Sequence, residues 1–162
     1  MDEELEHAAI QLSERLLGKG LSIVTAESCT GGWVAKVLTD IAGSSAWFER
    51  GFVTYSNAAK HEMLGVQPEL IDAQGAVSEA VVREMVHGAI ANSAADLALA
   101  VSGVAGPGGG TAEKPVGTVW FAWGRCGSVP VTRMLRFDGE RDQVRRQAVL
   151  AALQGALDLI ER

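Results

Sequence analysis

The sequence predicts an α/β fold, a three-layer α/β/α sandwich with a mixed β-sheet, and three observations support it. Helical and strand patterns alternate along the chain, as they do where strands are joined by helices. Residues 97–102 form a continuous apolar run, which indicates a strand buried on both faces. Residues 116–137 contain two strand patterns around a short turn, which indicates a hairpin. We therefore expect residues 1–162 to form one domain around one sheet.

The first half of the chain predicts three helices and two strands. Leu5, Ala9, Leu12 and Leu16 recur at helical spacing, and this helix stops at Gly18. The elements expected next are a strand over 21–26, a helix that follows Ser28 and includes Trp33, a linker over 42–45, a strand over 51–55, and a short helix that is capped by Asn57 and contains Lys60.

The second half predicts two helices around three strands. Ser78 is expected to cap a helix that ends near Ser93, because Val81, Met85 and Ala89 follow it at helical spacing. The elements expected after it are the strand over 97–102, hairpin strands over 116–123 and 129–137 with a turn over 124–127, and a closing helix from about Arg141.

Composition narrows the class of protein. A net charge of −6 argues against a nucleic acid partner, because binding to a phosphate backbone requires clustered Lys and Arg on the protein. No apolar stretch reaches 18 residues and no signal peptide is seen, so we expect no membrane contact. Two cysteines, Cys29 and Cys126, give no disulfide framework and fit a reducing cytoplasm. No Cys/His spacing fits zinc, and we expect neither a metal nor a cofactor.

The most informative segment is residues 26–32, which read Ala-Glu-Ser-Cys-Thr-Gly-Gly. Ser28 is expected at a strand-to-helix turn, where free backbone N–H groups suit an oxyanion or a phosphate. Ser28 is thus a candidate nucleophile, with the N–H groups of Cys29, Thr30 and Gly31 as its oxyanion site. Cys29 is a competing nucleophile. The alternative is that Ser28 or Thr30 only caps the helix.

A serine nucleophile needs a base, and the chain offers few candidates. The G-x-S-x-G elbow is absent, and none of the three histidines (His7, His61 and His87) has a catalytic context. Lysine can also serve as the base. Lys19 ends a helix and Lys36 is about 12 Å from Ser28, which leaves Lys60 and Lys114.

Lys60 has the better surroundings of these two lysines. It is expected in the first turn of a helix, where the macrodipole disfavours a cation, and burial would lower its pKa further. Tyr55, the only tyrosine, precedes it by five residues and can share its cleft. The alternative is a solvated helix lysine beside a core tyrosine.

Five motifs occur in the order seen in the CinA C-terminal domain family, which the chain resembles from about residue 8 to residue 155. They are residues 25–32 (TAESCTGG), 51–60 (GFVTYSNAAK), 75–78 (GAVS), 102–107 (SGVAGP) and 114–120 (KPVGTVW). The resemblance implies the sandwich fold and a Ser/Lys hydrolase with Ser28 as nucleophile, Lys60 as general base and Tyr55 as an assisting hydroxyl. It further implies hydrolysis of the carboxamide of nicotinamide mononucleotide to nicotinate mononucleotide and ammonia. Residues 1–20 leave no room for the molybdopterin-binding-like domain of full-length CinA proteins.

A glycine-rich segment, residues 102–111, provides a further candidate site. Several glycines can present N–H groups to one anion, although such runs are more often plain connections. Because the segment follows a buried strand, we favour a ligand-binding loop. Arg141, Arg145 and Arg146 form a basic cluster. The substrate phosphate would lie either at the glycine-rich segment or at Arg141 and Arg145. The remaining candidate substrate contacts are Asn57, Ser102, Gly103 and Gly106.

Two rival functions remain open at this stage, a catalytically silent nucleotide-binding module and an amidase for another heteroaromatic amide. The resemblance also implies a homo-oligomer, in the simplest case a two-fold dimer. Trp33 and Trp47 flank the candidate site and could lie at its interface, although large aromatic residues are more often part of a core.

Overall fold

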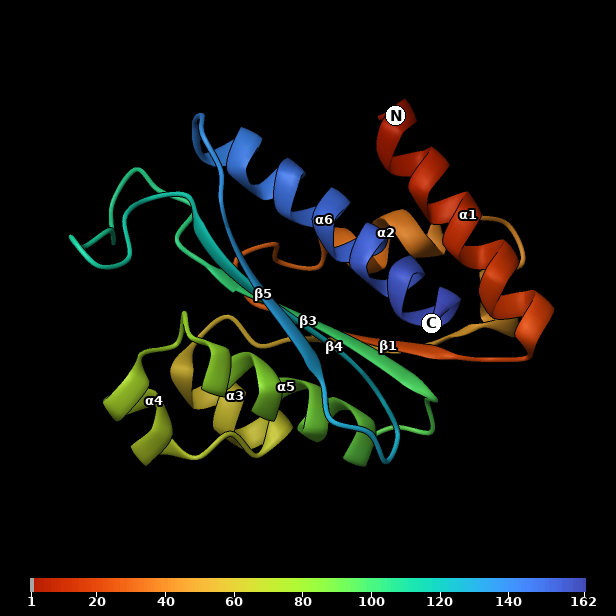
Figure 1. Cartoon of the computed structure of the whole chain (residues 1–162), viewed down its shortest axis with the longest axis horizontal. Helices are drawn as coiled ribbons and strands as arrows, with labels where there is room; N and C mark the ends of the chain where they lie inside the picture. The colour runs from red at the N-terminus through yellow and green to blue at the C-terminus, as the bar shows by residue number, and fades with distance from the viewer. Residues whose placement is uncertain (1) are drawn as a thin grey trace.

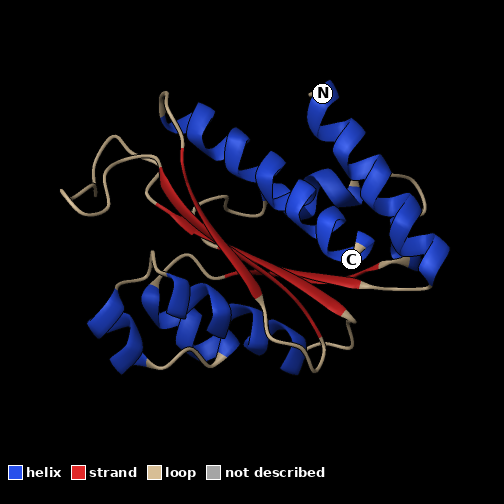
Figure 2. Ribbon diagram, viewed as in Figure 1, coloured by secondary structure: helices blue, strands red, loops and turns tan. Residues whose placement is uncertain are grey.

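The computed structural model describes residues 2–162 and shows a five-stranded sheet between two layers of helices (Figures 1 and 2). Its elements are α1 (Glu3–Lys19), β1 (Ile23–Glu27), α2 (Trp33–Thr39), the 3-10 turn η1 (Ser44–Ala46), β2 (Phe48–Val53), α3 (Asn57–Leu64), α4 (Pro68–Gln74), α5 (Glu79–Ala91), β3 (Leu97–Gly103), β4 (Thr118–Arg125), β5 (Val131–Arg136) and α6 (Arg141–Glu161).

The sheet is mixed, as the sequence predicted. Its strand order is β2-β1-β3-β4-β5, and β1 runs parallel to both β2 and β3. The β4 strand is antiparallel to β3 and to β5, so the predicted hairpin is confirmed. Helices α1, α2 and α6 cover one face, and α3, α4 and α5 cover the other (Figure 1). The three-layer prediction is therefore correct.

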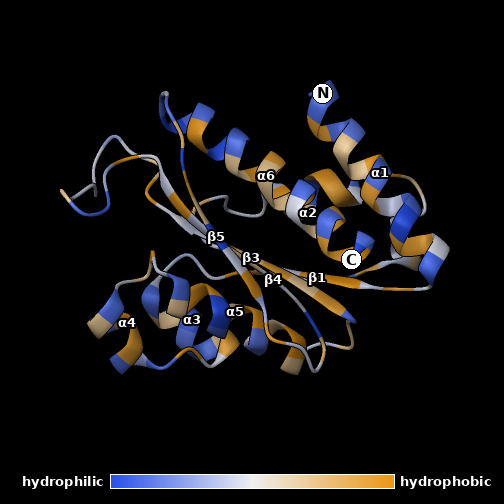
Figure 3. Cartoon of the chain, viewed as in Figure 1, coloured by the Kyte–Doolittle hydropathy of each residue, from blue (hydrophilic) through white to orange (hydrophobic). Residues whose placement is uncertain are grey.

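The side chains of β3 show how one strand serves two cores. Leu97, Leu99 and Val101 point to the α1/α2/α6 layer, whereas Ala98 and Ala100 point to the α3/α4/α5 layer. Successive residues of a strand face opposite sides, and both sides are covered here, which explains the continuous apolar run. In the hydropathy colouring the central strands β1 and β3 are mostly orange, whereas the helices alternate between orange and blue (Figure 3).

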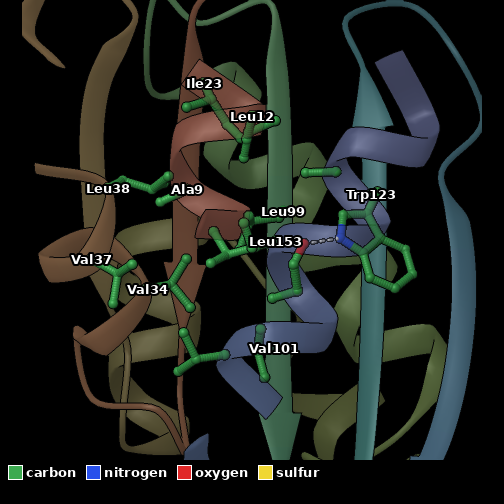
Figure 4. Close-up of a cluster of buried hydrophobic side chains, with 14 of the residues drawn as sticks. Ala9, Leu12, Ile23, Val34, Val37, Leu38, Leu99, Val101, Trp123 and Leu153 are labelled. Carbon is green, nitrogen blue, oxygen red and sulfur yellow. Dashed lines mark hydrogen bonds between the residues drawn. The ribbon is translucent and has the colours of Figure 1, made fainter. Parts of the chain in front are cut away.

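The core under α1, α2 and α6 contains large side chains from the sheet (Figure 4). Leu12, Leu99 and Leu153 pack together there, and the Trp123 indole donates a hydrogen bond to the Ala152 carbonyl oxygen at 2.9 Å. A Cβ added at Gly155 would collide with the Trp123 ring. Trp123 therefore fixes how closely α6 lies on β4.

The opposite core is built from small sheet residues, which lets α5 lie close to the strands. Ala26, Ala98, Ala100 and Ala122 provide this surface. Close packing continues between helices, because a Cβ at Gly88 would overlap the carbonyl of Leu64 in α3. This packing presses α3, the helix that carries Lys60, against α5.

Four local predictions were wrong, and each has a physical reason. The α4 helix was missed because it is short and has a single buried residue, Ile71. The β2 strand spans 48–53 rather than 51–55, since it pairs along the whole of β1. Ser56 caps α3 through the Ala59 N–H, and Asn57 is the first helical residue. The helix expected directly after Ser28 begins only at Trp33, because Gly31 and Gly32 hold the left-handed conformation, with φ of +60° and +99°.

The strand order positions the candidate site. β1 lies between β2 and β3; the connection from β1 to β2 passes over one face of the sheet through α2, and the connection from β2 to β3 passes over the other through α3, α4 and α5. Glu27, at the end of β1, pairs with Val53 of β2 and with Val101 of β3, so all three strands end at one edge. Open α/β sheets bind ligands in the crevice at such a switch point.

Candidate active site

Ser28 and Lys60 meet at this edge of the sheet. Ser28 follows β1, and its N–H donates to the Val101 carbonyl oxygen at 3.0 Å, which ties it to β3. Lys60 lies in the first turn of α3, and its Nζ is 2.9 Å from Ser28 Oγ. The two groups predicted as nucleophile and base are therefore in direct hydrogen-bond contact.

Lys60 is almost fully buried, with 1% of its surface exposed. Its Nζ also donates to the carbonyl oxygens of Thr54, at 2.9 Å, and Tyr55, at 3.2 Å. None of the ion pairs within residues 2–162 involves it. Burial without an opposite charge lowers the pKa of Lys60 from 10.5 to about 8. The solvated-lysine alternative is thereby excluded.

The turn that follows Ser28 is held by Glu27, a residue to which the sequence analysis gave no role. The buried Glu27 carboxylate accepts from Thr30 Oγ1 at 2.6 Å and from the N–H groups of Val34 and Ala35, at 2.9 and 3.0 Å. The first N–H groups of α2 are therefore occupied, and neither Ser28 nor Thr30 caps the helix. Any oxyanion site belongs to the turn itself.

Arg145, from α6, holds the same turn from another direction. Its Nε donates to the Cys29 carbonyl oxygen at 3.0 Å and its Nη2 to that of Thr30 at 3.2 Å. The guanidinium also lies over the Trp33 ring, 5.6 Å from the centroid. Arg145 is not part of the lining of the cleft over Ser28 and Lys60, which argues against it as the phosphate site that the sequence left open.

Two further members of the turn have limited roles. The Gly31 N–H donates to the Ser28 carbonyl oxygen at 3.0 Å, and this residue has a φ of +60°. The Gly31 N–H is therefore not free for an oxyanion, contrary to the prediction. Cys29 is buried, and burial raises the pKa of its thiol to about 12, which keeps it protonated and weakly nucleophilic at neutral pH.

A cleft of about 280 Å³ opens over Ser28 and Lys60. Its walls come from the turn after β1, the start of α3, the segment before α5, the glycine-rich loop after β3 and the start of α6. The lining residues are Ser28, Cys29, Tyr55, Asn57, Lys60, Ala76, Val77, Ser102, Gly103, Val104, Ala105, Gly106, Gly108, Gly109 and Arg141. The glycine-rich segment thus forms one wall of the cleft.

Tyr55 and Arg141 lie together at this cleft. The Arg141 guanidinium donates to Tyr55 Oη at 3.0 Å and to the Gly106 carbonyl oxygen at 2.7 Å. Tyr55 is 59% exposed, so the core-tyrosine alternative is wrong. It contacts Lys60 through its backbone carbonyl, and its hydroxyl is bonded to Arg141. Arg141 links three walls of the cleft.

Other predicted residues have supporting contacts. The Ser102 hydroxyl donates to the Ala76 carbonyl oxygen at 2.9 Å and so fixes the 75–78 segment. Lys114 is not part of the lining; its Nζ donates to the Gln74 carbonyl oxygen at 2.6 Å. Trp47 is buried within the chain's own core, and Trp33 packs against that core. Both tryptophans therefore take part in the core, which was the alternative to a position at a subunit interface.

Residues 2–162 contain no cluster of His, Cys, Asp or Glu side chains suited to a metal ion. In that same range, every helix is too short or too polar to span a bilayer.

Comparisons with known proteins show the family of the chain. The sequence model of the CinA C-terminal domain matches residues 5–160. The chain is 58% identical over 153 residues to nicotinamide-nucleotide amidohydrolase PncC of Escherichia coli K12, covering 94% of this chain and 93% of that protein. It is 56% identical over 151 residues to the Pseudomonas putida protein of the same name, covering 93% and 94%.

Solved structures give the same result. The crystal structure of the competence/damage inducible protein CihA from Agrobacterium tumefaciens superposes with a TM-score of 0.95 at 44% identity, over all of this chain and 98% of that one. With a family model that covers nearly its whole length and relatives of this identity, the chain belongs to the CinA C-terminal domain family.

Proposed function

We propose that this chain hydrolyses the carboxamide of nicotinamide mononucleotide to nicotinate mononucleotide and ammonia by a Ser/Lys mechanism. The observation that carries the proposal is the contact between Ser28 Oγ and a buried Lys60 whose pKa is lowered to about 8. The naming of two close relatives as nicotinamide-nucleotide amidohydrolases supports this choice of substrate. Residues 1–162 would then form a single amidohydrolase domain.

The contacts of Lys60 suit a base. A neutral amine keeps two N–H donors and one lone pair. If the N–H groups donate to the carbonyl oxygens of Thr54 and Tyr55, the lone pair faces the Ser28 hydroxyl. These two fixed carbonyls therefore orient the base for proton abstraction.

The reaction then proceeds in two steps, acylation of Ser28 and hydrolysis of the acyl-enzyme. Ser28 Oγ attacks the amide carbon while its proton passes to Lys60, and Lys60 returns a proton to the departing nitrogen, which leaves as ammonia. Water next attacks the acyl-enzyme, with Lys60 again taking and returning a proton, and releases the carboxylate and Ser28. The positively charged pyridinium ring withdraws electrons from the amide carbon and favours both attacks.

The oxyanion formed in each step would be held by the turn after Ser28. Within residues 2–162 the N–H groups of Cys29 and Thr30 have no hydrogen-bond acceptor, although both residues are buried. We assign these two N–H groups to the oxyanion site. Donors of this kind contribute a few kcal/mol each to transition-state stabilisation.

Substrate binding is assigned to the mouth of the cleft. With Lys60 neutral, Arg141 is the cation of the lining, and the lining has no carboxylate to repel a phosphate. Arg141, with the N–H groups of Ala105 and Gly106, would receive the phosphate, since the Val104 N–H already donates to the Thr118 carbonyl oxygen. Tyr55, held by Arg141, would orient the ring and assist as a hydroxyl, with Asn57 beside it at the start of α3 and Ser102 at the end of β3.

The decisive experiment measures ammonia release from nicotinamide mononucleotide, its riboside, nicotinamide and NAD by the purified chain. Turnover of the mononucleotide well above the other three supports the proposal. Binding of the mononucleotide without release of ammonia would instead identify a silent nucleotide-binding module, and preference for another amide would identify a different amidase. The homodimer stays a prediction, which a single-chain mass in light scattering of the fully active protein would contradict.

A further inference from the structure

We propose that Arg145 is a positioning residue that, together with Glu27, holds the turn after Ser28 so that its free N–H groups face the reacting carbonyl oxygen. This inference rests on the proposed amidase function. It assigns to Arg145 a role in kcat through the geometry of the oxyanion site, and no role in substrate binding.

The first step of the argument is the grip of Arg145 on the turn. Two nitrogens of one guanidinium donate to two consecutive carbonyls, those of Cys29 and Thr30, at 3.0 and 3.2 Å. The planar fork matches this spacing, whereas a lysine offers a single point of attachment. Stacking on Trp33 fixes the plane of the fork.

The second step follows from the planarity of the peptide bond. The C=O of one residue and the N–H of the next point in opposite directions across a trans peptide. By holding the Cys29 carbonyl, Arg145 turns the Thr30 N–H away from itself. By holding the Thr30 carbonyl, it turns the Gly31 N–H to the other side, where that N–H meets the Ser28 carbonyl. The Thr30 carbonyl also accepts from the Trp33 N–H at 3.0 Å, so Arg145 and the start of α2 set the orientation of the turn together.

The third step is the role of Glu27 at the same residue. Its carboxylate binds the Thr30 hydroxyl at 2.6 Å and is itself fixed by the N–H groups of Val34 and Ala35. Thr30 is thus held by its carbonyl and by its side chain, while its N–H finds no acceptor within residues 2–162. Such a combination is expected of a donor that must be preorganised for an oxyanion.

The neighbouring arginines of α6 provide matched controls. Arg141 lies one turn earlier and contacts the mouth of the cleft, so it should act on substrate binding. Arg146 follows Arg145 directly but pairs with Asp2 and Glu4, away from the cleft. The three arginines of α6 thus have three separate positions: Arg145 holds the turn, Arg141 lies at the mouth of the cleft, and Arg146 pairs with residues at the start of α1.

The test compares Arg145→Lys, Arg145→Gln and Arg146→Gln in steady-state hydrolysis of nicotinamide mononucleotide by the full chain. We expect kcat to fall about 10- to 100-fold in both Arg145 variants. Deletion of an oxyanion donor lowers kcat by ~10²–10³-fold, and a misplaced donor should have a smaller effect. KM should change less than about threefold, and Arg146→Gln should resemble wild type.

A second readout separates positioning from general loss of structure. A 3-boronic acid analogue of the substrate forms a tetrahedral adduct with a serine, and its inhibition constant should rise in parallel with the fall in kcat. Near-ultraviolet circular dichroism checks the packing of Trp33. Should Arg145→Gln fail to fold, Glu27→Gln, which keeps the size of the side chain, should show the same kcat and boronate losses.

Three results would overturn the inference. A raised KM with unchanged kcat would make Arg145 a substrate-binding residue. Equal kcat values for the Arg145 and Arg146 variants would show that the contacts of Arg145 are merely structural. A boronate affinity that does not follow kcat would show that Arg145 has no role at the oxyanion site. A wild-type chain that releases no ammonia contradicts the proposed function itself, whereas the first three results leave that function intact.

Discussion

Lys60 Nζ lies 2.9 Å from Ser28 Oγ, and the other two contacts of this nitrogen are backbone carbonyls. No histidine lines the cleft around them. A serine whose partner is a buried lysine depends on the neutral form of that lysine, which makes the pair testable by substitution and by pH.

Ser28→Ala should reduce kcat at least about a thousandfold, because the nucleophile of an acyl-transfer enzyme cannot be replaced by a methyl group. The fold and the affinity for the mononucleotide should remain. Cys29→Ala is the matched control and should stay active, since the buried thiol is protonated at neutral pH. An active Ser28→Ala beside an inactive Cys29→Ala would transfer the nucleophile to Cys29.

Lys60→Arg should also be inactive even though it keeps the positive charge. Arginine does not deprotonate at working pH and so cannot accept the Ser28 proton. The measurement is kcat for Lys60→Arg beside binding of the mononucleotide by calorimetry. Appreciable kcat with a raised KM would show that the residue acts as an anchor through its charge.

The rate should depend on pH through Lys60. Because burial lowers its pKa to about 8, kcat/KM should rise with pH through that value and level off above it. The profile is measured with wild type and with Tyr55→Phe, which should keep the same inflection. A rate that stays flat between pH 6 and pH 9 would contradict the assignment of Lys60 as the base.

The same pKa affects stability. The unfolded chain binds a proton at Lys60 up to about pH 10.5, and the folded chain only up to about pH 8. Stability therefore carries a penalty below pH 8 that disappears as the pH rises to 10.5. Relative to Lys60→Met, which has no such proton, wild type should gain up to about 3 kcal/mol in free energy of unfolding over this range, measured by urea titration. A difference that stays constant with pH would refute it.

Gly155→Ala should destabilise the protein although alanine is the better helix former. The added Cβ meets the Trp123 ring, which a hydrogen bond to Ala152 holds in place, so the free energy of unfolding should fall by roughly 2 kcal/mol or more. Gly18→Ala, in α1 with open space around it, is the control and should gain up to about 1 kcal/mol. Similar effects at both glycines would mean that Trp123 moves aside.

The sequence predicted the layers because they depend on local patterns. The apolar run 97–102 and the helical spacing of Leu5, Ala9 and Leu12 are visible in any short window, and the structure confirms both. Boundaries were less predictable where pairing between strands decides them, as for β2, whose start follows from its register with β1. The α4 helix has too few buried residues to leave a pattern.

The candidate site was predictable in its reacting groups and not in their supports. Ser28 and Lys60 belong to recognisable motifs, and the structure places them in contact. The contacts of Arg145 with the turn join residues 115 and 116 positions apart, and no local pattern reports such a distance. One feature of the sequence points to Glu27: it is a carboxylate at the end of an otherwise uncharged strand.

The dispersed origin of the cleft affects how the protein would lose function. Its walls come from segments between residue 28 and residue 141, and the last of them, α6, closes the mouth and also packs against α1. Partial unfolding that released α6 would separate Arg141 from Gly106 and Arg145 from Cys29 in one event. Enzymatic activity should therefore disappear at lower denaturant concentration than the helical signal of the remaining layers, which makes turnover a sensitive probe of the docking of α6.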